Sequence, residues 1–278
     1  MQLAQQQELN VMIMVKAAPV VTPAQGESIC VAAMSLDGHD GKSQWIRLYP
    51  VPFRDLADNS KFRKFQEVKL QAVRPRNDRR PESWKPIEGS FQPGRVIGTE
   101  ANWSERRSRV AQLGEATLCE LLELNRSRSI PSVPSLAVVR TSAAPELLIK
   151  RRSPNEIRQW QERIQYIESR PSLFDESDKT NAVCEVVPWR FQYRYKCQAR
   201  RCNGHQQTIV DWELVALWRH VRHQSDWQEK IRAKYGDELW AHNRDTRLFV
   251  GNMVRRPQNF LVLGVFWPPR SDLQEQLI

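Results

Sequence analysis

The residues from Pro188 to Lys196, PWRFQYRYK, form the most regular pattern in this chain. Aromatic side chains occupy one parity, and basic or polar side chains occupy the other. The aromatic set is Trp189, Phe191, Tyr193 and Tyr195, and the other set is Arg190, Gln192, Arg194 and Lys196. Successive side chains of a β-strand point to opposite faces. The pattern therefore predicts a strand whose aromatic face is buried in a sheet and whose cationic face points outward.

The elements around this strand predict an α+β fold with two domains. Residues 1–150 consist largely of short β-favouring runs separated by Gly, Pro and Asp turns, which indicates a β-rich, barrel-like N-terminal domain. Residues 151–278 are expected to form an α+β domain in which helices pack on an antiparallel sheet. The boundary follows from a change in pattern, since the second part alternates strand signals with helical periodicity.

Two longer helices are predicted from apolar periodicity. The first, near residues 103–125, would bridge the two domains, and Cys119 lies beside its apolar face as a core residue. The second begins at Pro154 and Asn155 and places four apolar residues on one face, which predicts a core stripe. These residues are Ile157, Trp160, Ile164 and Ile167.

The charge of the chain favours a polyanionic partner. It contains 42 lysine and arginine residues against 32 acidic residues, a formal net charge of +10, and arginine is much the commoner cation. Arginine binds phosphate with two parallel hydrogen bonds and stacks on bases, so DNA or RNA is the expected partner. The cationic face of the central strand continues into the following loop, and its expected phosphate contacts are Arg190, Arg194, Lys196, Arg200 and Arg201.

A second basic segment, residues 74–86, combines arginines with prolines and one tryptophan. Proline keeps such a backbone extended and displays its side chains. Arg76, Arg79 and Arg80 are therefore candidate phosphate contacts, with Trp84 as a stacking platform for a base. The alternative is a surface connector whose Trp84 packs back onto the barrel.

A loop with metal-ligand chemistry follows the central strand. Cys197, Cys202 and His205 have a spacing that lets one loop wrap a tetrahedral zinc ion. A structural zinc site needs a fourth ligand, and Cys184, His220 and His223 are candidates. The alternative is two ordinary thiols in a basic loop.

Asp211 and Glu213 suggest a different chemistry. If they lie in a strand, both carboxylates point to one face and can hold Mg²⁺ for phosphodiester hydrolysis. If they lie in a helix, the pair separates and Asp211 becomes an N-cap. The chain contains no GxxxxGK[ST], GxGxxG or GxSxG motif, so the sequence favours binding over catalysis.

Five cysteines without framework spacing indicate a reducing, cytoplasmic setting. The run Val11–Val15 is too short for a secretory signal, and no stretch approaches the roughly 18 apolar residues of a membrane span. The leading hypothesis is a cytoplasmic nucleic-acid-binding protein with a structural zinc loop, acting within a larger DNA- or RNA-processing assembly. The alternatives are a magnesium-dependent nuclease that uses Asp211 and Glu213, and a protein–protein adaptor whose basic face meets an acidic partner.

Overall fold

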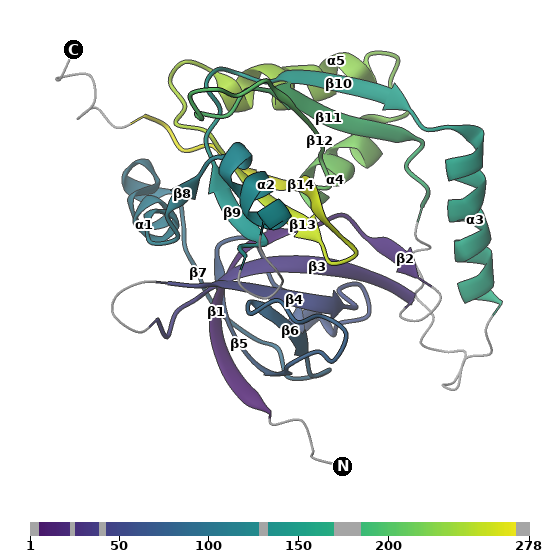
Figure 1. Ribbon diagram of the computed structural model, residues 1–278. Coiled ribbons are helices and arrows are strands. Elements are labelled where there is room, and N and C mark those ends of the chain that lie inside the picture. The colour runs from purple at the N-terminus through teal and green to yellow at the C-terminus, as the bar shows by residue number, and fades with distance from the viewer. Residues whose placement is uncertain (1–5, 23–25, 39–42, 128–132, 170–184, 271–278) are drawn as a thin grey trace.

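The computed structural model describes residues 6–22, 26–38, 43–127, 133–169 and 185–270, and it confirms the α+β fold class (Figure 1). The N-terminal elements are β1 (Gln7–Lys16), β2 (Val20–Thr22), β3 (Gly26–Ser35), β4 (Trp45–Val51), η2 (Asp58–Ser60), β5 (Gln66–Val73), β6 (Ser83–Pro86), β7 (Gln92–Val96) and α1 (Glu100–Ala111). The later elements are β8 (Glu115–Ala116), α2 (Leu118–Ser127), β9 (Leu136–Val139), β10 (Glu146–Arg151), α3 (Pro154–Glu168), β11 (Trp189–Tyr195), β12 (His205–Thr208), α4 (Trp212–Val221), α5 (Trp227–Arg232), η4 (Ala233–Asp237), η5 (Glu238–Trp240), β13 (Arg247–Met253) and β14 (Arg256–Phe266).

Five N-terminal strands close into the predicted barrel, in the order β1-β3-β4-β6-β5, because β5 pairs back onto β1. Both faces of β1 are buried, which explains its unbroken apolar run. Val11 and Ile13 enter the barrel core. Met12 and Met14 point the other way, into a second core that they share with Phe249 of β13 and with the end of β14. The barrel is therefore packed directly against the C-terminal sheet.

The C-terminal part contains two sheets. The first has the order β10-β11-β12 and is antiparallel, and the second has the order β14-β13-β9-β8. Helix α4 packs Leu214 and Trp218 into the core between them, together with Tyr193 of β11. Within the described ranges, no helix combines the length and the apolar character needed to cross a membrane.

Strand β11 follows the predicted alternation in part, since Gln192 of the polar parity is buried and Trp189 of the aromatic parity is only half-buried. Phe191, Tyr193 and Tyr195 are buried, and Arg194 is exposed on the other face. Tyr193 is completely buried and donates a hydrogen bond to the backbone carbonyl of Tyr235 at 2.6 Å. The aromatic parity of this strand is thus part of the core.

The helical pattern near residues 103–125 is divided in the structure. Helix α1 ends before Gly114, whose φ of +68° is a conformation that favours glycine, and α2 begins at Leu118. The short strand β8 lies between the two helices and pairs with β9. The sequence therefore predicted helical content here but not the interruption, since one glycine within a helical period is a weak signal.

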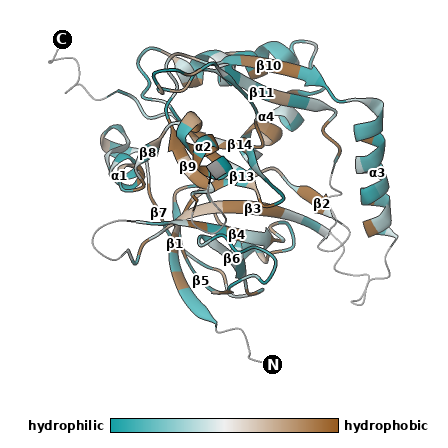
Figure 2. Cartoon of the chain, viewed as in Figure 1, coloured by the Kyte–Doolittle hydropathy of each residue, from teal (hydrophilic) through white to brown (hydrophobic). Residues whose placement is uncertain are grey.

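Helix α3 departs from the predicted core stripe. It begins with a capping box formed by Ser153 and Glu156, but none of its side chains is buried. It stands at the edge of the molecule next to β2 (Figure 1), and most of its surface is hydrophilic (Figure 2). The four residues of the predicted stripe are only half-buried, and of these Trp160 lines a groove that is described below.

Buried hydrogen bonds connect the barrel to the C-terminal sheet. Arg47 of β4 is 4% exposed, and its Nη2 donates to both the carbonyl oxygen and the Oγ of Ser135, at 2.9 Å each. Arg80 likewise donates to the backbone and side-chain oxygens of Asn252 in β13, at 3.0 Å each. A Cβ atom on Gly251 would lie 2.8 Å from Leu136 and Leu263 side-chain atoms and 3.2 Å from Arg47 Nη2. Glycine is therefore required for this close approach.

We expect Gly251→Ala to lower the free energy of unfolding by about 1–3 kcal/mol, because the added methyl group overpacks the junction. Urea denaturation would measure this change. Gly236→Ala is the control, since a Cβ there would lie 4.0 Å from the Leu147 side chain, and we expect it to be neutral or slightly stabilising. Equal stability of the wild type and Gly251→Ala would contradict the proposed tightness of the junction.

Candidate functional site

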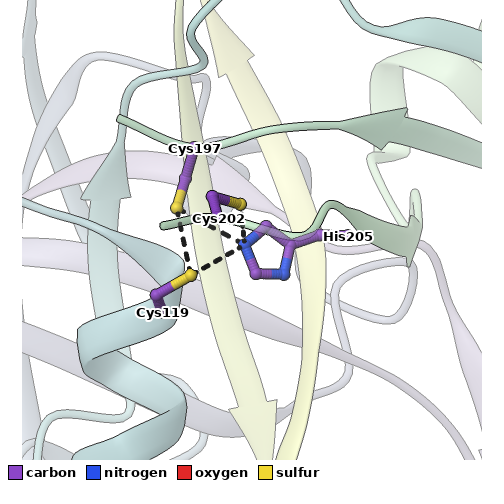
Figure 3. A group of neighbouring side chains, drawn as sticks. All are labelled: Cys119, Cys197, Cys202 and His205. Atoms are coloured by element: carbon purple, nitrogen blue, oxygen red, sulfur yellow. Dashed lines mark hydrogen bonds between the residues drawn. The ribbon is translucent and has the colours of Figure 1, made fainter. Parts of the chain in front are cut away.

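Four side chains from two distant segments form a cluster that could hold a metal ion (Figure 3). Cys197 follows β11, Cys202 lies in the next turn, and His205 begins β12. Cys119, in the first turn of α2, completes the group. Their potential ligand atoms all lie within 4.8 Å of one another. The predicted triad is thus brought together, and the fourth member is a residue that the sequence had placed in the core.

The distances in this cluster match a tetrahedral ion. Cys197 Sγ lies 3.6 Å from Cys119 Sγ, and His205 Nε2 lies 3.1 to 3.5 Å from the three sulfur atoms. Zinc–sulfur bonds of about 2.3 Å and a zinc–nitrogen bond of about 2.0 Å place tetrahedral ligand atoms about 3.5–3.8 Å apart. These four distances are therefore close to those expected of a Cys₃His site.

The local environment affects the protonation of these ligands. Burial, followed by the neighbouring thiols, raises the pKa of Cys119 to about 12. Burial also disfavours the thiolate of Cys197, but hydrogen bonds led by the backbone of Ala199 outweigh it, so the pKa of that thiol is lowered. Burial lowers the pKa of His205 and so keeps its imidazole neutral, as a metal ligand must be.

The other predicted fourth ligands do not join this cluster. His220 and His223 lie at the end of α4 and just after it, and His223 Nε2 accepts a hydrogen bond from Arg222 Nε at 3.0 Å. Cys184 lies outside the described residues. Cys119 carried no local signal in the sequence, since 78 positions separate it from Cys197.

A groove of about 1520 Å³ runs between the barrel and the C-terminal part. Nine cationic side chains line it, against two acidic ones, Asp78 and Glu185. Its walls come from β2, β4 and the loop before β6 on one side, and from α3, the start of β11, α4 and the β13–β14 turn on the other. The groove is therefore a strongly basic concave surface.

Five of these cations make internal contacts that position the walls. Arg47 and Arg80 belong to the junction described above, Arg152 donates to the carbonyl of Val187, and Arg219 lies 3.9 Å from Glu185. The fifth, Arg74, stacks its guanidinium 3.6 Å from the centroid of the Trp84 ring. These side chains give the groove a positive potential but have limited freedom to contact a ligand.

The remaining four cations of the groove are exposed: Arg76, Lys85, Arg163 and Arg255. None of them forms an ion pair with a residue that the structure describes. They come from the loop before β6, from β6, from α3 and from the β13–β14 turn, so they surround the opening. Of these four residues, the sequence predicted only Arg76 as a phosphate contact. The other three come close to Arg76 only in the folded chain.

Apolar side chains lie between these cations. Trp160 of α3 and Trp189 of β11 line the groove and are half-buried. Val20, Met253 and Val254 also line it and are 38 to 48% exposed, which is unusual for large apolar residues in this chain. The groove thus offers both cationic and apolar contacts to a ligand.

The predicted phosphate contacts of the central strand lie elsewhere. Arg190 is ion-paired with Glu156, and Arg194 with Glu146 across the β10–β11 pair. Lys196, Arg200 and Arg201 are exposed beside the metal cluster. Their role as a binding surface stays a prediction.

The segment 74–86 has a different arrangement from the one predicted. Arg76 and Arg79 are exposed, but Arg80 is 7% exposed and is paired with Asp78. Trp84 is 5% exposed beneath Arg74, so in this conformation its ring has no free face for a base. Here the connector alternative, with Trp84 packed on the barrel, describes the observed contacts.

Asp211 and Glu213 follow the helical alternative. Asp211 is the N-cap of α4, where its Oδ1 accepts from the backbone N–H of Glu213 at 2.9 Å, and it is 2% exposed. Glu213 is exposed and forms an ion pair with Lys64 at 3.1 Å. An ion bound by both carboxylates would have to displace this lysine. Burial raises the pKa of Asp211 to about 7, opposed by Lys64 and reinforced by Glu213.

Comparison with known proteins identifies the family. A family model described as "Domain of unknown function (DUF8757)" matches residues 114–278, more than half of the chain, and the chain belongs to that family. A second model, "Domain of unknown function (DUF8758)", matches residues 7–112. The two models meet near residue 113, and the predicted division at residue 150 stays a prediction.

The remaining comparisons give no functional information. No curated protein matches the chain. A solved structure described as "Structure of murine DNA binding protein bound with ds DNA" aligns with 95% of this chain and 96% of that chain, at 8% identity and a TM-score of 0.30. A likeness of that degree does not establish a common fold.

We expect Asp211→Asn to change how stability depends on pH. The folded chain keeps this carboxyl protonated up to about pH 7, whereas the unfolded chain ionises it near pH 4. The folded state therefore binds an extra proton in this window, and the contribution of Asp211 to stability is lost as the pH rises. Asparagine retains the N-cap and does not ionise. The stability of the variant relative to the wild type should increase from pH 4 to pH 7 in urea denaturation, and a constant difference would contradict the effect of burial.

Proposed function

We propose that this protein binds nucleic acid in the basic groove between the barrel and the C-terminal part. The observation that carries the proposal is the lining of the groove, with nine cations against two acids. Phosphate groups bound there would release counterions, which is the main source of affinity in nucleic-acid complexes. A concave surface also brings cations from several elements within reach of one strand.

The four exposed cations supply the phosphate contacts in this proposal. Arg76, Lys85, Arg163 and Arg255 have no ion-pair partner among the described residues, so binding a phosphate would not require them to break one. Arginine can grip a phosphate with two hydrogen bonds, and three of the four are arginines. The internally bonded cations would add to the potential without direct contact.

The apolar contacts favour a single strand over a duplex. Trp160 and Trp189 line the groove and are half-buried, with Arg152 over the first ring and Trp227 against the second. Val20 and Met253 also line the groove and are exposed. Unpaired bases stack on aromatic side chains, which contributes about 1–3 kcal/mol per base. A duplex presents mainly phosphates to such a groove and would leave the apolar surface unused.

We expect reversal of three groove charges, Arg76→Glu, Arg163→Glu and Arg255→Glu together, to weaken binding of a single-stranded oligonucleotide by at least about 100-fold. The slope of log K against log [salt] should fall by about 2, since each lost phosphate contact removes about 0.7. Fluorescence anisotropy at several salt concentrations measures both quantities.

The matched control reverses Lys196, Arg200 and Arg201, which changes the net charge by the same amount on the predicted strand-and-loop surface. Affinity for the same oligonucleotide should then fall by less than about tenfold. If the control loses binding while the groove variant retains it, the binding surface is the one beside β11 and the groove assignment is wrong. If both triple variants bind the oligonucleotide as the wild type does, the result favours an acidic protein partner.

We also propose that the metal in the Cys₃His cluster is zinc and that its role is structural. Three sulfur ligands and one imidazole are the donor set that zinc prefers, and four protein ligands leave no open position for water. The metal would join α2 to the β11–β12 turn, close to Arg200 and Arg201. It would therefore support the C-terminal sheet that forms one wall of the groove.

The purified protein should contain one zinc ion per chain by elemental analysis. Cys119→Ser should weaken zinc binding by at least about tenfold in a competition assay with a chromophoric chelator, since loss of even an indirect partner of a ligand costs that much. Binding should also weaken between pH 7 and pH 5, because protons compete for the thiolates and the imidazole. Cys30→Ser removes a thiol outside the cluster and should bind zinc as the wild type does. A Cys119→Ser variant with unchanged affinity would exclude this ligand set.

A further inference from the structure

A second cavity, of about 490 Å³, lies beside the N-terminus of α4. It shares no lining residue with the groove. Trp103 and Trp267 provide aromatic walls, Asp211 and Tyr235 are buried at its base, and Lys64 and Lys234 are only partly exposed. Small-molecule sites fall in this range of volume and combine apolar walls with a few polar groups.

Unusual backbone conformations converge on this cavity. Among the described residues, four that are not glycine have positive φ: Phe65, Ala101, Asn102 and Trp103, and the first and last of these line the cavity. Such conformations cost roughly 1–2 kcal/mol each and concentrate at ligand and catalytic sites. Residues Ala233–Asp237 form a π-helix, a rare element that also marks functional sites, and it carries both Lys234 and Tyr235. Three irregular segments thus shape one small space.

The aromatic walls are held in place by cations. Arg106 stacks 4.5 Å from the centroid of Phe65 and 5.0 Å from that of Trp103, and it donates hydrogen bonds to the carbonyl of Ile97. Lys234 Nζ lies 4.4 Å from the Trp267 centroid. Trp103 and Trp267 are 5.4 Å apart in a T-shaped arrangement. Arg244 also lies 4.6 Å from the Trp267 centroid, so both indoles are braced by cations and form a fixed aromatic wall of the cavity.

The polar groups retain hydrogen-bonding capacity. Asp211 Oδ2 has only a long contact, 3.4 Å, with the Tyr235 hydroxyl. Lys64 uses two of its three N–H bonds, toward Glu213 and the carbonyl of Val265. The cations that line the cavity, Lys64, Arg106 and Lys234, exceed its two lining carboxyl groups, and Lys234 is also ion-paired with Glu238 outside the lining. The unused capacity thus favours a ligand with an anionic group and with N–H donors.

We infer that this cavity binds a nucleotide, with its base stacked on Trp103 or Trp267, N–H donors of the base edge on Asp211, and its phosphate near Lys64 and Lys234. A nucleobase unites a planar ring with polar edge groups, and a phosphate supplies the anion. The nucleotide has two sources, a free mononucleotide or an unpaired nucleotide of a bound strand. The second source rests on the proposed nucleic-acid function, whereas the first is independent of it.

Isothermal titration calorimetry with AMP, GMP, CMP and UMP tests the free source. We expect at least one of them to bind, with Asp211→Asn weakening that binding at least tenfold. This variant keeps the N-cap, so it should fold. Lys234→Gln, at the edge of the cavity, should weaken binding of the same nucleotide more than that of its nucleoside. The groove variant Arg76→Glu, Arg163→Glu, Arg255→Glu should bind the mononucleotide as the wild type does.

An oligonucleotide of about ten residues tests the other source. If no mononucleotide binds at 1 mM but Asp211→Asn and Lys234→Gln both weaken oligonucleotide binding, the cavity takes a nucleotide from a bound strand. The inference is wrong if no mononucleotide binds and neither variant affects the oligonucleotide. It is also wrong if mononucleotide binding is unchanged in both variants. If no mononucleotide binds and only the groove variant loses oligonucleotide binding, the proposed function stands and the inference about the cavity is overturned.

Discussion

The contact of the buried Arg47 guanidinium with Ser135 determines how the two parts of this protein face each other. A buried cation is tolerated only when hydrogen-bond acceptors surround it, and removal of its partners is strongly destabilising. The Ser135 hydroxyl in turn donates a hydrogen bond to Glu82, which lies just before β6 in the barrel. Ser135, next to β9, is therefore bonded to two residues of the barrel, Arg47 and Glu82. Asn252 and Arg80 repeat the arrangement nearby. The groove lies along this junction, so its width is fixed by the same contacts.

The net charge of the chain has two separate structural uses. Many arginines serve the fold: Arg140 and Arg247 share Glu115 and Asp245, and Arg106 braces aromatic rings. Such pairs contribute little excess potential outside the molecule. The groove differs because cations from segments far apart in the sequence gather there with only two carboxylates to offset them. The location of the excess charge is therefore more informative than its total.

The fold and the site differ in how far they followed from sequence. Local periodicity predicted the α+β class and the buried aromatic parity of β11. The two-residue period of a half-buried strand can be seen in consecutive residues of the sequence. It also selected Cys197, Cys202 and His205, whose spacing is local. Local periodicity did not identify Cys119, Arg163 and Arg255 as site residues, since tertiary contacts alone bring them close to the other members of their sites. Trp84 and the stripe on α3 show the reverse limit, because the local sequence does not reveal which apolar side chains the tertiary fold buries.

The metal cluster has a consequence for the unfolded chain as well as for the folded one. A bound ion would join Cys119 to Cys197, 78 positions apart, and so close a long loop that contains β9, β10 and α3. In the chain-entropy model, a permanent cross-link around a loop of that length reduces the conformational entropy of the unfolded state by an amount worth about 4–5 kcal/mol at 25 °C. Helix α3, which has no buried side chain of its own, lies inside this loop. The ion would thus restrict the freedom of a segment that packing alone holds only loosely.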